Sequence, residues 1–157
     1  ALDILSHPQS YPGLPEHRQP AILRVWEYPS FAPYVSWAIF RSKKECAVRR
    51  ITWAQSKTIA PQPVTYGAEA AIEESALNKL LNELAKIQLP PFLDVPTLGI
   101  DGASYGVEIG SFGASARLCW WNKLPQEWAA LQQWHERAVQ QFESLLPART
   151  PDTRHSA

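Results

Sequence analysis

The chain has 157 residues, of which 45% are hydrophobic and 19% are charged, and its formal net charge is zero. This length suits one domain that buries a substantial core. A zero net charge gives no overall field to attract nucleic acid or an anionic membrane, and no apolar run approaches the ~20 residues that span a bilayer. We therefore expect a soluble, cytoplasmic protein with a single domain.

The first twenty residues contain four prolines, with polar residues between them. Because proline fixes φ and removes a hydrogen-bond donor, residues 1–20 are predicted to form an extended arm. This arm either drapes over the domain or is loose. Residues 21–147 are predicted to form one folded domain, and residues 148–157 are predicted to be a polar, disordered tail.

The first half of the domain contains three stretches in which successive side chains alternate between two faces, and each stretch is rich in β-branched and aromatic residues. This period of two predicts three strands. Short turns separate them, which favours antiparallel pairing. The prolines that follow predict a connecting loop at 55–67. The predicted strands are 21–28, 34–41 and 46–54.

The second half of the domain mixes helical and strand patterns. Residues 69–88 are predicted to form a helix, because leucines recur at helical spacing and glutamates fill the first turns. Two strands, 104–109 and 114–121, are predicted to form a hairpin. A second amphipathic helix is predicted from Pro125 to Leu146, since proline suits the first helical position.

The predicted order βββ–α–ββ–α gives a mostly antiparallel sheet of about five strands, with two amphipathic helices on one face. The fold class is α+β. The strands also place aromatic side chains on the other face, which is either a partner surface or is covered by the arm. We favour the partner surface, and the candidate residues for binding a partner are Trp37, Trp53 and Trp121.

Residues 102–106 match the pattern G-x-S-x-G, in which a serine hydroxyl is lifted by a strand-to-helix turn. Here Ser104 begins a strand that another strand follows, so we assign no catalytic residue. A hydrolase remains an alternative, with Ser104, His135 and Asp101 as its candidates. The non-catalytic explanation of the two glycines in this pattern is a turn with positive φ at Gly102 and close packing or a bulge at Gly106.

His135 lies on the apolar stripe of the second predicted helix. A buried imidazole needs a hydrogen-bond partner, and with one it is a stable core residue. The functional alternative is a pH-sensitive group or a catalytic base. We favour the core interpretation.

Basic residues concentrate around the predicted hairpin 41–50. A basic ribbon can follow phosphates, so nucleic-acid binding is a second alternative. The zero net charge instead favours a solvated hairpin whose lysines prevent edge pairing. The basic residues are Arg41, Lys43, Lys44, Arg49 and Arg50.

The two cysteines, Cys46 and Cys119, are predicted to be free thiols, since pairs of cysteines in a chain of this kind are more often reduced. The cysteines and the four histidines show no spacing typical of zinc ligands. The glycines show no phosphate-binding pattern. We therefore expect no metal and no cofactor.

The closing part of the chain reads Asp101-Gly102-x-Ser104-Tyr105-x-Val107-x-Ile109, then Arg117-Leu118-x-Trp120-Trp121, then Pro125-x-x-Trp128-x-x-Leu131. This pattern resembles that of small bacterial proteins of unknown function. The resemblance covers about a third of the chain. It implies a bacterial origin, a soluble domain and a turn–strand–turn–strand–helix unit, and it brings no activity.

These observations predict a non-enzymatic module that binds another protein or a second copy of itself. Immunity-type and other small partner-inhibiting proteins have a similar size and architecture, and they are the analogous class. The alternatives are a serine hydrolase that uses Ser104 and His135, and a nucleic-acid binder that uses the hairpin 41–50.

Overall fold

The computed structural model describes residues 7–43, 45–54, 64–90, 101–111 and 113–148. The strands are β1 (Leu23–Pro29), β2 (Tyr34–Arg41), β3 (Cys46–Ala54), β4 (Val64–Ile72), β5 (Ala103–Ser111) and β6 (Ala114–Trp121). The helices are η1 (Pro8–Ser10), α2 (Glu74–Leu84), η2 (Gln126–Trp128) and α3 (Ala129–Leu145), of which η1 and η2 are single 3-10 turns. Neither α-helix is long and apolar enough to cross a membrane.

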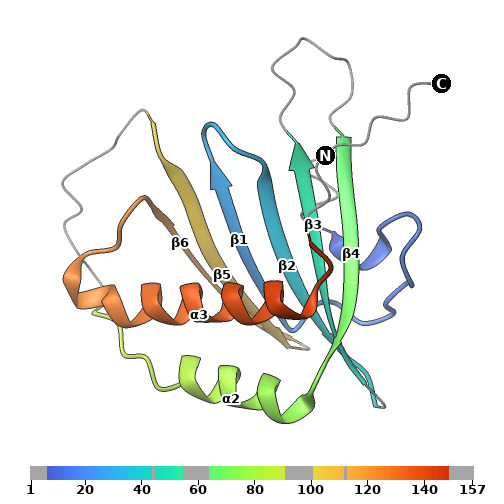
Figure 1. Ribbon diagram of the computed structural model, residues 1–157. Coiled ribbons are helices and arrows are strands. Elements are labelled where there is room, and N and C mark those ends of the chain that lie inside the picture. The colour runs from blue at the N-terminus through green and yellow to red at the C-terminus, as the bar shows by residue number, and fades with distance from the viewer. Residues whose placement is uncertain (1–6, 44, 55–63, 91–100, 112, 149–157) are drawn as a thin grey trace.

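All six strands belong to one antiparallel sheet with the order β4-β3-β2-β1-β5-β6. The first four strands form a meander, and β5 then returns to pair with the free side of β1. Both α-helices lie on the same face of this sheet (Figure 1). The two-layer α+β prediction is therefore confirmed, but with six strands rather than five and the order ββββ–α–ββ–α.

The fourth strand was missed from the sequence, because residues 64–72 were assigned partly to a loop and partly to the first helix. Alanines and Glu69 favour a helix by local propensity. In the structure these residues pair along the whole of β3, and Glu69 lies opposite Arg49. Long-range pairing overrides local propensity here. The first helix is accordingly shorter than predicted and begins at Glu74.

The core lies between the helices and the sheet. Trp37 is completely buried there, and its Nε1 donates a hydrogen bond to Glu143 Oε1 on α3 at 3.0 Å. Trp134 Nε1 donates to the carbonyl oxygen of Leu80 at 2.9 Å, which joins the two helices. Burying large indoles with satisfied N–H groups contributes strongly to a core. Trp37 is therefore a core residue, and its assignment to a partner surface was wrong.

Candidate partner-binding face

We call the sheet face opposite the helices the far face. The antiparallel register aligns its side chains in rows that cross the strands. Three of these rows are Arg24–Ala38–Arg49–Glu69, Trp26–Ser36–Ile51–Gly67 and Tyr28–Tyr34–Trp53–Thr65.

The N-terminal arm covers the far face over β2, β3 and β4. The His17 ring stacks on Phe40 with centroids 3.9 Å apart. The Tyr11 ring fills the space above Gly67, where any Cβ would collide with it, and the Tyr11 hydroxyl donates to Thr65 Oγ1 at 3.2 Å. For this half of the face, the sequence-based alternative of an arm that covers the sheet is correct.

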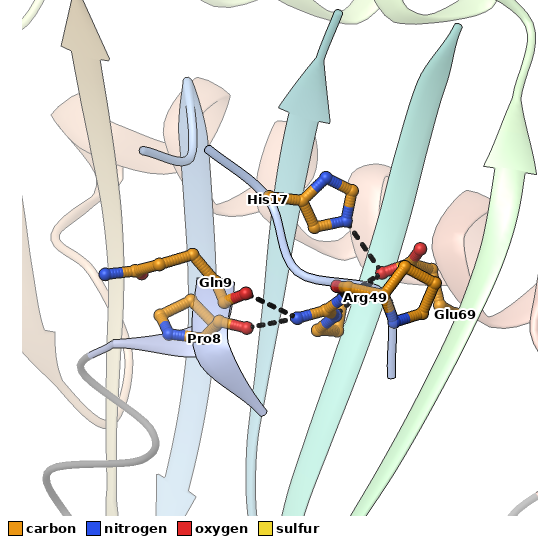
Figure 2. A network of polar contacts seen from close by, with 6 residues as sticks. Pro8, Gln9, His17, Arg49 and Glu69 are labelled. Atoms are coloured by element: carbon orange, nitrogen blue, oxygen red, sulfur yellow. Dashed lines mark hydrogen bonds and ion pairs between the residues drawn. The ribbon is translucent and has the colours of Figure 1, made fainter. Parts of the chain in front are cut away.

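Arg49 holds the arm in place (Figure 2). Its side chain is completely buried, and its Nε donates to Glu69 Oε2 at 2.7 Å. Its Nη1 donates to the carbonyl oxygens of Pro8 at 2.6 Å and Gln9 at 3.2 Å, and its Nη2 donates to that of Pro15. One guanidinium thus binds two separate parts of the arm while a carboxylate matches its charge, which makes its burial tolerable.

Arg50, the next residue, points to the opposite face. It is buried beneath α3, where Nη1 donates to Glu143 Oε2 at 2.5 Å and Nη2 donates to the carbonyl oxygen of Pro147 at 2.9 Å. A cavity of about 350 Å³ lies beside it, and Tyr11 from the arm and Pro147 both contribute to its lining. Arg50 therefore attaches the chain that follows α3 to the sheet.

The predicted basic ribbon is not a surface feature at Arg49 and Arg50, because each is neutralised inside the protein. Consecutive strand residues point to opposite faces, so these two could not belong to one patch. Arg41 donates to Asn78 on α2, while Lys43 is exposed in the turn. Lys44 lies outside the described residues.

The other half of the far face carries a group of aromatic side chains that we call the aromatic end. Tyr28 and Tyr34 stack across β1 and β2 with centroids 4.9 Å apart, and Trp53 meets Tyr34 edge-on at 5.1 Å. Phe31, in the β1–β2 turn, is 82% exposed. The aromatic end consists of Tyr28, Phe31, Tyr34, Trp53 and Trp121.

Two polar atoms at the aromatic end lack partners. The indole N–H groups of Trp53 and Trp121 are buried and make no hydrogen bond. Burial also raises the pKa of the Tyr28 hydroxyl. A buried donor without an acceptor is destabilising, and such groups are rare in native proteins. Both tryptophans were predicted to lie on this face, and each is partly buried there.

Trp26 separates the two halves of the far face. It is 3% exposed, because its indole lies against Gly106 and the Arg117 guanidinium is 4.9 Å above its ring. A Cβ at residue 106 would collide with the indole, so the prediction of close packing at this glycine is confirmed.

The turn before β5 differs from the prediction, because Gly102 does not have a positive φ. The neighbouring residue with positive φ is Asn122, which directly follows β6 and has a φ of 57°. Its Oδ1 accepts a hydrogen bond from the N–H of Ala103 at 3.0 Å, and its side chain occupies the space where a Cβ of Gly102 would lie. Gly102 is therefore needed for close packing rather than for an unusual backbone conformation.

The three hydrolase candidates do not come together. Ser104 aligns with Tyr28 and Trp121 on the far face, whereas His135 lies on the helix side of the sheet. Asp101 is exposed in the turn before β5. The sheet separates the serine from the imidazole, so no proton can pass directly between them.

His135 occupies a closed site between α3 and the sheet. Its Nε2 lies 3.3 Å from the carbonyl oxygen of Trp26, which can only accept, so Nε2 carries the proton. The rings of Tyr105 and Trp120 meet the imidazole edge-on, with centroids 5.7 Å and 5.2 Å away. Burial lowers the pKa of His135 to about 4, so it is neutral at pH 7 even though Glu27 Oε1 lies 3.9 Å from Nδ1.

No group of three or more metal-ligating side chains occurs among the described residues. Cys46 is buried and Cys119 is exposed, and neither forms a disulfide.

Comparison of the chain with protein-family models, curated proteins and solved structures finds no match. The resemblance to small bacterial proteins therefore stays a prediction, and the geometry of the two faces is the basis for assigning a function.

Proposed function

We propose that this protein is a non-catalytic module that binds a partner protein through the aromatic end of the far face. The observation that supports this function best is the position of Phe31, a large apolar side chain that is 82% exposed in a turn beside stacked aromatic rings. An isolated exposed apolar residue is ordinary, but Phe31 lies in the turn that joins the two strands of the stacked Tyr28 and Tyr34, and clustered aromatic residues are typical of an interface.

The chemistry of the aromatic end suits a protein partner. Tyrosine and tryptophan contribute much of the binding energy at interfaces, because they combine a large apolar area with a polar atom. The indole N–H groups of Trp53 and Trp121 lack acceptors in this chain. Backbone carbonyl oxygens of a partner would satisfy them if local side-chain movement brings the atoms together.

Neither alternative receives comparable support. Ser104 and His135 lie on opposite sides of the sheet, and the paired carboxylates of Glu69 and Glu143 neutralise the two buried arginines.

A partner-inhibiting role of the immunity type is the specific form of binding that we propose. It is supported by the size and architecture of the domain.

The test uses two variants with matched chemistry. Phe31→Ser removes the exposed ring at the aromatic end, while Leu145→Ser removes a 41% exposed apolar side chain from α3 as a control. A partner captured from an extract of the source organism should bind the unmodified protein and the control equally. Phe31→Ser should weaken its affinity, measured by calorimetry, about 30-fold, the effect of losing a strong interface residue.

Equal affinity for all three proteins would show that the partner uses another surface. Failure to capture any protein would also count against the proposal, provided the extract comes from cells that express the protein at its normal level.

A further inference from the structure

The sheet has two edge strands, β4 and β6, and they differ in accessibility. The N–H of Asn122 donates to the carbonyl oxygen of Ala103, the first residue of β5, at 2.8 Å. Because the direction of these groups alternates along an antiparallel strand, the N–H and C=O groups of Ser115, Arg117 and Cys119 point away from β5. These groups are unpaired within the part of the chain that the structure describes.

Within the described residues, the β6 edge carries few of the features that normally prevent strand pairing. It contains no proline and no lysine, and its register with β5 continues without a bulge from Trp121 to Ala114. Residues 114–117 and Cys119 are exposed, and most of them are small. The one charged residue, Arg117, is directed over the Trp26 ring on the far face rather than outward along the edge.

The β4 edge is obstructed by the arm. Tyr11 lies directly on Gly67 of β4, and in Figure 1 the arm extends past β4 on that side of the sheet. The arm beside β4 would restrict the approach of another strand. Pairing of β4 in one copy with β6 in another, which would produce an open filament, is therefore disfavoured.

We propose that β6 pairs in antiparallel fashion with β6 of a second copy of this chain, which joins the two sheets across a two-fold axis. This contact is isologous and closes as a dimer. The register centred on Leu118 places Arg117 opposite Cys119 of the second copy. The neighbouring register centred on Arg117 would oppose two arginines and is unfavourable.

This inference is independent of the proposed function, because it uses the edge of the sheet and not the aromatic end. Strand pairing along one edge buries a small area compared with the ~1,600 Å² of a standard interface. The dimer should therefore be of micromolar affinity and should dissociate on dilution. Sedimentation velocity across a wide range of protein concentration measures this directly, with a reducing agent present to prevent disulfides through Cys119.

Substitutions at Cys119 separate edge pairing from other modes of association. Cys119→Pro removes an outward N–H that β5 does not use, so it should leave the hairpin intact and abolish the dimer. Cys119→Val keeps the N–H and favours a strand, so it should dimerise like the unmodified protein. Cys119→Lys should also be monomeric, because the lysine would face Arg117 of the second copy. It needs no change in the backbone, so it tests the proposal even if the proline variant does not fold.

The proposal is overturned if the unmodified protein stays monomeric at the highest concentration, or if Cys119→Lys dimerises as strongly as Cys119→Val. Phe31→Ser should dimerise normally. A monomeric Phe31→Ser variant would place the contact at the aromatic end and would also overturn edge pairing.

Discussion

The two faces of this sheet are closed in different ways. On the helix face, α2 and α3 contribute a broad apolar surface, and burial is shared among many side chains such as Leu77 and Trp134. On the far face, a short arm covers half of the sheet, and Arg49 binds it mainly through backbone carbonyl oxygens. The helix face should therefore tolerate single changes better than the arm, because Arg49 alone provides the hydrogen bonds to Pro8, Gln9 and Pro15.

The largest expected effect is that of removing Arg49. Arg49→Ala leaves Glu69 partly buried without its cation and leaves the arm carbonyls without their donor. Breaking a buried ion pair in this way costs about 3–5 kcal/mol. Urea unfolding measures this loss, and Arg41→Ala, at a partly exposed arginine, should stay within about 0.5 kcal/mol of the unmodified protein. Similar losses in both variants would show that the arm does not depend on Arg49.

Acidification should destabilise the helix face through His135. Its pKa is about 4 in the folded protein and near 6.5 when unfolded, so the unfolded state binds the proton more readily. Stability is therefore full above pH 6.5 and falls as the pH drops toward 4, by about 3 kcal/mol over that range. The free energy of unfolding as a function of pH gives this slope. His135→Gln should have a shallower slope, and an unchanged slope would assign it to other groups.

A smaller effect is expected at the boundary between the two halves of the far face. Gly106→Ala forces the Trp26 indole to move and should cost about 1–3 kcal/mol through overpacking. Gly110→Ala is the matched control on the same strand, since its Cβ would meet only the Ala21 carbonyl oxygen at 3.5 Å. Thermal unfolding of the two variants compares them, and equal midpoints would mean that Trp26 is free to move.

The smallest effect on stability is expected at Phe31. Its ring is largely exposed, so Phe31→Ser should change the free energy of unfolding by less than about 0.5 kcal/mol. A loss of more than 1 kcal/mol in urea unfolding would show that the ring is packed in solution. The aromatic end would then be as closed as the rest of the far face.

The sequence predicted the elements whose periodicity is strong. Five strands and both amphipathic helices followed from side-chain spacing and end signals, and the shared helix face followed from the layer architecture. The strand β4 was missed because its alanines and Glu69 carry a helical propensity, while the pairing with β3 that decides its structure is long-range. Such pairing leaves no local signal.

The candidate site was predicted only in part. Strand alternation shows that Trp37 and Arg50 share one face and that Trp53 and Arg49 share the other, but it does not show which face the helices cover. The helices cover the face that carries Trp37, and Trp37 is therefore a core residue. The role of Arg49 could not be predicted, because its partners in the arm are backbone carbonyls, which every residue possesses.

The cavity beside Arg50 has a practical consequence, because Tyr11 and Pro147 line it together. The two ends of the described chain thus come within reach of each other next to β4. A covalent link between the segments that carry Tyr11 and Pro147 would keep the arm near its site even after it detached.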